Sequence, residues 1–215
     1  MERRKALKNM GLALGYTVAT PTLLGIVQSC KEVSDVSWVP DFLSSDEGSA
    51  LTKLVDIILP ATDTPSASEL QVHLFIDKFA NEVMEQEQQG FFKMAMGKFL
   101  DKALKDSGED KAGDLSTENL EQLLASTLKI SKEQQTQNEE AIGDYMKAMA
   151  EGGGAKISDE VAAYAFASNL RGMTIWGYKT SEYIGEEVLA YLPVPGEYIG
   201  CGDVQELSGG KAWSL

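Results

Sequence analysis

Apolar residues recur at spacings of three and four along most of this chain, between residues 44 and 192. That spacing places them on one face of an α-helix, whereas a half-buried strand would alternate apolar and polar residues. No alternating run of strand length competes with the helical pattern. We therefore expect an all-α protein, an irregular helical bundle of about six or seven helices. The apolar stripes fall at residues 51–58, 72–83, 92–103, 120–128, 142–149, 161–170 and 184–192.

Start and stop signals separate these helices from one another. Ser44 and Glu47 have the spacing of a capping box, in which two side chains satisfy free N–H groups at a helix start. Pro60 ends the first helix because it lacks an N–H group and its ring clashes with the preceding turn. Residues 193–215 hold five glycines and two prolines, so an extended, irregular tail is expected there. We assign residues 42–215 to a single helical domain that includes this tail.

The first 29 residues differ from the rest and are expected to form an export signal. A basic start precedes an apolar run from Met10 to Val27 and then a small residue, which is the order of a secretory signal. Because Glu2 and Ala6 depart from the twin-arginine pattern, export of the unfolded chain stays an alternative to export of the folded chain. The residues that resemble the twin-arginine signal are Arg3, Arg4, Leu7 and Lys8.

Cys30 stands where a bacterial lipoprotein signal places the cysteine that becomes acylated. The preceding residues resemble a lipobox, although Gln28 is bulkier than usual. An acyl anchor holds a protein at a membrane because each buried methylene contributes roughly 0.8 kcal/mol. A plain cleaved signal and an uncleaved spanning helix are the alternatives. We expect an exported protein of the bacterial periplasm or cell envelope, lipid-anchored at Cys30, with residues 30–41 as a tether.

The charge of the chain excludes one class of partner. Lys and Arg total 19 and Asp and Glu total 33, which gives a net charge of −14. The first 30 residues hold four bases and one acid, so the remainder is more acidic still. Such a surface repels phosphate backbones and anionic lipid head groups. Nucleic-acid binding is therefore not expected, and membrane attachment requires the lipid.

The motifs of catalytic, cofactor and metal sites are missing. His73 is the single histidine, which excludes a His-rich metal site and haem held by two histidines. It falls beside the apolar stripe of Val72 and Ile76 and is expected to be structural. The sequence has no Gly-x-Gly-x-x-Gly after a strand, no Cys-x-x-Cys-His and no Gly-x-Ser-x-Gly. We therefore expect no catalytic residue, cofactor site or metal site in this chain.

Three short elements give the chain a family resemblance. Residues 57–65 read Ile-Ile-Leu-Pro-Ala-Thr-Asp-Thr-Pro, and two further elements follow near the C-terminus. With these elements in this order, the chain resembles the gluconate 2-dehydrogenase subunit 3 family from about Trp38 to Cys201. The matching positions of the later elements are Gly177, Tyr178 and Ser181, then Pro195, Gly196, Tyr198, Gly200 and Cys201.

The resemblance implies a role beside a larger enzyme. Members of this family are small gamma-type subunits of membrane-bound gluconate, sugar and related dehydrogenases. The catalytic partner is a flavin-dependent dehydrogenase of the glucose–methanol–choline type, and a cytochrome c subunit often completes the complex. FAD is thus expected in the partner and haem c in a third subunit, with no cofactor in this chain. The small subunit supports export, maturation and anchoring of the catalytic subunit.

A partner-facing surface is expected in the C-terminal part of the chain. Trp and Tyr dominate the binding energy of many protein interfaces, and aromatic residues cluster here on a partly irregular segment. The alternative is that they complete the core of this chain, above all Trp176. Glycines 177, 196 and 200 are expected at backbone turns. The residues assigned to the partner interface are Trp176, Tyr178, Ser181, Tyr183, Pro195, Gly196, Tyr198 and Cys201.

Cys201 has two possible states. The chain has two cysteines, so acylation of Cys30 would leave Cys201 without a partner in the same chain. It would then form a disulfide with another subunit or remain a thiol packed as a small apolar group.

Two other functions also stay open: a surface or periplasmic lipoprotein that binds an extracellular ligand, and a stand-alone oxidoreductase.

Overall fold

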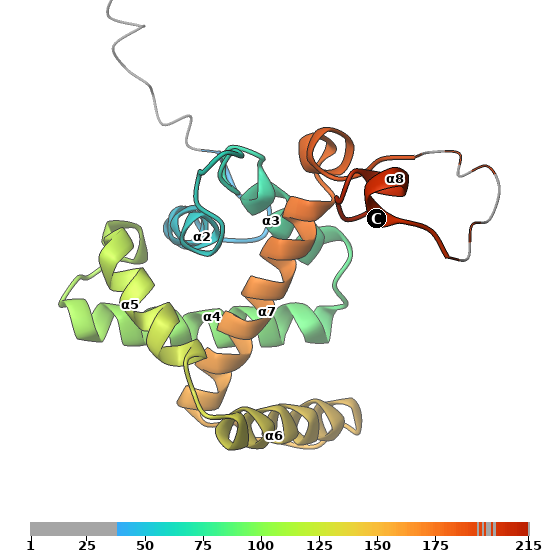
Figure 1. Ribbon diagram of the computed structural model, residues 1–215. Helices are drawn as coiled ribbons and strands as arrows, with labels where there is room; N and C mark the ends of the chain where they lie inside the picture. Colours follow the sequence, from blue (N-terminus) through green and yellow to red (C-terminus); the bar gives the residue numbers. More distant parts are fainter. Residues whose placement is uncertain (1–37, 193, 195, 197–198, 200, 215) are drawn as a thin grey trace, which may run out of the picture. The chain divides into compact units, whose positions relative to one another are not determined.

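The computed structural model describes residues 38–192, 194, 196, 199 and 201–214 (Figure 1). The predicted export signal and most of the predicted tether lie outside these residues. Cys30, Arg3, Arg4, Leu7 and Lys8 therefore stay predictions from the sequence. From residue 40 on, the described residues form one compact unit, and the description below concerns this unit.

The described residues are helical and contain no β-strand, which confirms the predicted all-α class. An isolated pair of bridging residues, Ala190 and Trp213, lies outside any strand. The elements in chain order are α2 (Ser45–Ile58), α3 (Val72–Glu82), α4 (Gln86–Ser107), the 3-10 helix η1 (Ala112–Asp114), α5 (Thr117–Leu128), α6 (Lys132–Ala150), α7 (Asp159–Lys179), the π-helix η2 (Tyr183–Val188) and α8 (Val204–Ser208).

Serine side chains begin several of these helices. The hydroxyl of Ser44 accepts a hydrogen bond from the Glu47 N–H at 3.3 Å, and the Glu47 carboxylate accepts one from the Ser44 N–H at 2.7 Å. This is the predicted capping box, and it satisfies two backbone donors that would otherwise have no partner within the helix. The side chains of Ser116, Ser131 and Ser158 cap α5, α6 and α7 in the simpler way. Short polar signals in the sequence thus set the helix starts.

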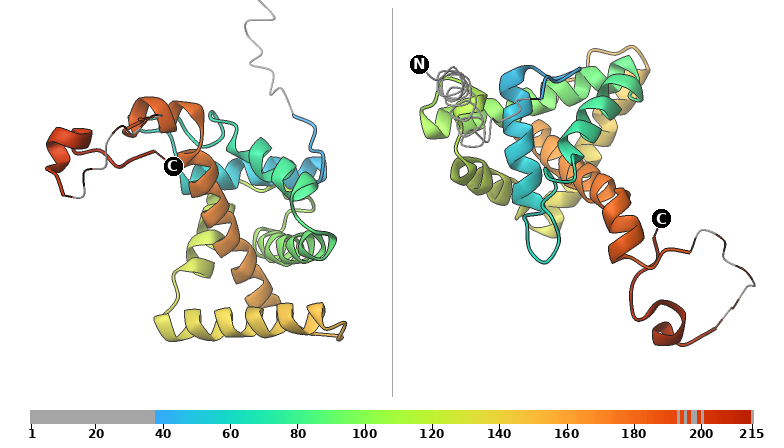
Figure 2. Two further views of the ribbon diagram at one scale, coloured as in Figure 1. Left: turned by 90° about the vertical axis from the view of Figure 1, so that its right-hand side faces the viewer. Right: turned by 90° about the horizontal axis from the view of Figure 1, so that it is seen from above.

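The helix α7 runs through the middle of the domain (Figure 1). It packs against α2, α3, α4, α5 and α6, and Figure 2 shows α6 lying across its N-terminal end. The ring of Phe166 on α7 lies 5.6 Å from that of Phe92 and 5.3 Å from that of Phe99, both on α4. Phe99 and Phe166 are among the largest fully buried side chains. The contact between α4 and α7 is therefore the centre of the core.

A buried carboxylate holds the start of the domain in place. Asp77 on α3 is 1% exposed, and it accepts hydrogen bonds from the N–H groups of Asp41 at 2.7 Å and Leu43 at 2.9 Å. A buried charge is stable only when such donors surround it. The contact fixes the segment that leads into α2 against α3.

The last predicted helix is shorter than its apolar stripe indicated. We expected helical structure across residues 184–192, but η2 ends at Val188 and Leu192 is 51% exposed. The backbone N–H of Ala190 donates to the Ala212 carbonyl at 2.8 Å, and the Ser214 N–H donates to the Ala190 carbonyl at 2.9 Å. These bonds occupy groups that a continuing helix would need. The tail beyond is largely irregular, as expected, but includes the short helix α8.

Candidate partner-binding surface

Large apolar side chains are exposed mainly near the C-terminus. Elsewhere in the described chain they are Val39, Val83 and Met149. A concentration of exposed apolar side chains marks an interaction site more reliably than scattered ones. We call the C-terminal set the tail surface: Ile175, Trp176, Tyr183, Tyr191, Leu192, Val194, Ile199, Val204, Leu207 and Trp213.

The end of α7 that leads to this surface is fixed by close packing on α3. A Cβ atom at Gly177 would lie 2.7 Å from Cδ1 of Phe75 and 3.2 Å from Cγ1 of Val72. A side chain therefore could not be added without displacing Phe75. The expectation that Gly177 serves a turn is wrong, because it lies inside α7. Its role is to let the two helices approach.

Tyr178 joins α7 to the loop after α2. Its hydroxyl donates to the Pro65 carbonyl at 2.8 Å and lies 2.7 Å from the hydroxyl oxygen of Thr64. Since its single proton goes to Pro65, it accepts from Thr64. Two elements of the sequence resemblance, residues 57–65 and the Gly-Tyr-x-x-Ser element, thus meet in space. The hydroxyl of Tyr178 is used within the chain, although the residue was assigned to the partner interface.

Trp176 combines the two roles that the sequence left open. Its ring meets Phe75 edge-on with a 5.0 Å separation of ring centroids, and Phe79 likewise at 5.4 Å. Edge-to-face pairs of this kind fix a ring in one position. The residue is nevertheless 43% exposed. Trp176 is therefore held by this chain's own core, and it also lines a hollow shared with residues of α4 and α6.

The π-helix η2 follows directly after α7. Ser181 lies at this junction, and its hydroxyl donates to the Tyr178 carbonyl at 2.8 Å. Ile184 is buried and anchors η2, whereas Tyr183 is 42% exposed. A π-helix has wider turns than an α-helix and is rare in proteins. Where one does occur, it frequently lies at a functional site. Trp176, Ser181 and Tyr183 thus lie close together in the chain, where α7 ends and, after residues 180–182, η2 begins.

The rest of the tail forms a loop that closes on η2. The bridge between Ala190 and Trp213 brings its two ends together, and Figure 1 shows α8 within this loop. Inside the loop, a Cβ atom at Gly202 would lie 2.7 Å from Cδ1 of Leu207, so this glycine permits α8 to fold back. The described residues 201–214 therefore fold back on themselves and leave Val204 and Trp213 exposed.

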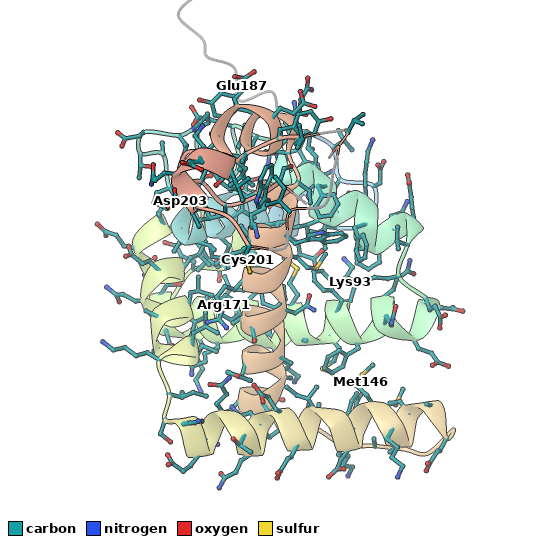
Figure 3. The ribbon with its side chains drawn as sticks, turned by 45° about the vertical axis from the view of Figure 1, so that its right-hand side comes forward. Lys93, Met146, Arg171, Glu187, Cys201 and Asp203 are labelled. Carbon is teal, nitrogen blue, oxygen red and sulfur yellow. The ribbon has the colours of Figure 1, made fainter. Side chains whose placement is uncertain are left out.

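The structure also places the remaining predicted interface residues. Gly196 has a φ of +67°, the turn conformation expected of it, and it is exposed on the loop. Cys201 is exposed on the same loop (Figure 3) and forms no disulfide among the described residues. Pro195 and Tyr198 lie outside the described residues. As interface residues, all of these stay predictions.

Several residues of the tail surface were not assigned to the partner interface from the sequence. Leu192 was assigned to a helical stripe, and Val194, Ile199 and Trp213 stood in a segment with no apolar periodicity. A usable signal did exist. Large apolar residues in a stretch rich in glycine and proline cannot be buried by a regular helix of their own, so they face either the body or a partner.

Two kinds of feature are not found among the described residues. They contain no cluster of three or more His, Cys, Asp or Glu side chains placed to hold a metal ion. Over the same ranges, no helix combines the length and hydropathy that crossing a membrane requires. His73 is buried on α3, where burial lowers its pKa and the charge of Asp56 acts in the opposite direction. Its placement is that of a core residue.

A family model described as gluconate 2-dehydrogenase subunit 3 matches residues 45–196 of the chain. The match takes in α2 through η2 and the first residues of the tail. It covers most of the helical domain and both motifs that Tyr178 brings together. No curated protein and no solved structure matches the chain.

Removing the Tyr178 hydroxyl should weaken the attachment of the loop at residues 61–65 to α7. We expect Tyr178→Phe to lower the free energy of unfolding by about 1–2 kcal/mol, since it removes two hydrogen bonds and leaves the Pro65 carbonyl unsatisfied. Urea unfolding measures the change. Tyr183→Phe is the matched control, because Tyr183 is half-exposed and its change should stay within about 0.5 kcal/mol. Equal stability of the two variants would contradict the assigned role of Tyr178.

Proposed function

The chain belongs to the gluconate 2-dehydrogenase subunit 3 family, and from that membership we propose that it is a non-catalytic accessory subunit of a membrane-associated, flavin-dependent dehydrogenase. The family name implies a subunit of a multi-subunit gluconate dehydrogenase complex. The substrate class of the complex is gluconate, a sugar or an alcohol. The single observation that supports this role most is the tail surface.

The tail surface has the properties of a docking site for a protein. Its side chains are large and apolar, and Trp176, Tyr183, Tyr191 and Trp213 supply the residue types that contribute most at protein interfaces. A rigid element presents part of it, because Trp176 is fixed by Phe75 and Phe79. Less conformational freedom is then lost on binding. The catalytic flavoprotein is the partner we propose for this surface.

The family indicates which subunit of the proposed complex would hold each cofactor. FAD would reside in the partner subunit of the glucose–methanol–choline type, and a cytochrome c subunit would carry haem c as the electron acceptor. This chain would contribute contacts and position to the catalytic subunit. It would also support the maturation of the catalytic subunit.

The partner surface can be tested by charge insertion. Leu192→Asp combined with Ile199→Asp places two carboxylates in the tail surface and should reduce the co-purifying flavoprotein at least tenfold, since buried unpaired charges are costly. The readout is flavin absorbance per mole of tagged chain. Val83→Asp is the matched control, because Val83 is 62% exposed outside the tail surface. Helix content by circular dichroism must be equal in all variants.

Unchanged flavin in the double variant would show that the tail surface does not bind the partner. Loss of flavin in the Val83 control as well would show that binding is not specific to the tail. Substrate oxidation by this chain alone, free of flavoprotein, would favour the alternative of a stand-alone oxidoreductase.

Cys201 is proposed to form a disulfide with the catalytic subunit. It is exposed on the tail loop beside the apolar side chains that would contact the partner, and an oxidising compartment permits the bond. Non-reducing electrophoresis of the complex should give one heavy band that splits when reductant is added, and Cys201→Ser should abolish it. If wild-type chains separate without reductant and Cys201 reacts readily with an alkylating agent, the bridge does not exist.

Export and anchoring complete the proposal and are supported by the sequence alone. A folded subunit exported through a twin-arginine signal could carry a bound partner that has no signal of its own, and acylated Cys30 would hold both at the membrane. Arg3→Lys with Arg4→Lys keeps the charge of the signal. We expect this change to retain both proteins in the cytoplasm, which fractionation measures. Unchanged export of both would favour transport of the unfolded chain.

A further inference from the structure

The helix α6 is attached to the domain more loosely than the other long helices. Of its residues Lys132–Ala150, only Asn138 is buried. It packs chiefly on α7, lying across the N-terminal end of that helix (Figure 2). By contrast, α4 and α7 pack tightly through the buried ring of Phe166, and an exposed ion pair of 3.0 Å between Lys98 and Asp159 lies beside this contact. One pair of helices therefore forms a rigid frame, and α6 lies against it.

An apolar slot lies between part of α6 and this frame. Its volume is about 790 Å³, within the range of roughly 300–1,000 Å³ that is typical of ligand-sized cavities. Phe91 and Phe92 line it from α4, and Ile142 and Met146 line it from α6. Figure 3 shows Met146 on the side of α6 that faces α4. Beside the slot, α6 contacts α4 directly, where the ring centroids of Phe91 and Tyr145 are 5.4 Å apart.

Both ends of α6 are joined by segments that can act as hinges. Residues 129–131 link it to α5, and residues 151–158 link it to α7 without regular structure beyond the first turn. The second link contains three consecutive glycines, and Gly152 has a φ of +73°. Glycine has more accessible backbone conformations than any other residue. A change of angle can therefore be taken up at these links without breaking a long helix.

The helix itself has enough internal support to move as a rigid body. It has 19 residues, longer than the about 12–15 residues below which isolated helices are marginal. Side-chain hydrogen bonds along it join Gln134 to Asn138 at 3.0 Å and Gln135 to Glu139 at 2.8 Å.

We propose that α6 is a hinged lid that closes on the frame by seating Ile142 and Met146 in the slot between α4 and α7. The open form is the one described above, with the slot unfilled by side chains. Closure removes from water the apolar surface of α6 and of the frame that lines the slot, and the hydrophobic effect therefore favours the closed form. The exposed polar face of α6 stays solvated. The occupant of the slot is thus a segment of the same chain. This inference does not depend on the proposed accessory role.

Distances between spin labels on the full chain test the lid directly. Labels are placed on added cysteines at Lys102 of α4 and Glu140 of α6, with Cys30 and Cys201 changed to Ser. We expect two distance populations for this pair, one open and one closed. The control pair, Lys102 of α4 with Arg171 of α7, spans the rigid frame and should give one. All three labelled positions are exposed, so the labels leave the slot free.

A second pair of changes separates lid motion from label motion. Ile142→Ser with Met146→Ser removes the apolar side chains that closure would bury, and should lower the ratio of closed to open populations by about tenfold or more. The control pair should not change. A single distance for the α4–α6 pair, or two populations whose ratio is unaffected by the serine changes, would overturn the proposal.

Discussion

The close approach of α7 to α3 at Gly177 is the contact on which the C-terminal part of the molecule depends. Because this residue has no side chain, Phe75 can fill the space beside it, and Phe75 in turn holds the ring of Trp176 edge-on. One residue later, the hydroxyl of Tyr178 binds the loop at residues 64–65. The position where α7 ends, and hence where η2 and the tail begin, follows from these contacts.

The chain has a charged, solvated exterior and a separate region of exposed apolar side chains. Its net charge of −14 keeps most of the exterior solvated and unsuited to nucleic acid or anionic lipid. Exposed apolar side chains gather instead at the end of α7, on η2 and on the described part of the tail. A helical body that positions a docking loop is the division expected of an accessory subunit. The slot beneath α6 is a second apolar region, and this chain can cover it with its own lid.

The sequence predicted the helices well where apolar periodicity and a cap coincided, as at Ser44. It failed where backbone hydrogen bonding overrode periodicity, as at Ala190, whose bonds to the tail end the helix before Leu192. It also placed Gly177 in a turn, since sequence alone does not distinguish a glycine needed for φ from one needed for close packing. The family was recognisable from three motifs, but their meeting at Tyr178 required the fold.

The central claim is that this chain works bound to a catalytic flavoprotein. Native mass measurement of the chain, extracted in mild detergent from the cells that produce it, tests this most directly. The account predicts a mass equal to this chain plus a larger, flavin-bearing chain. A mass equal to this chain alone, from cells that contain an active dehydrogenase of this type, would contradict it.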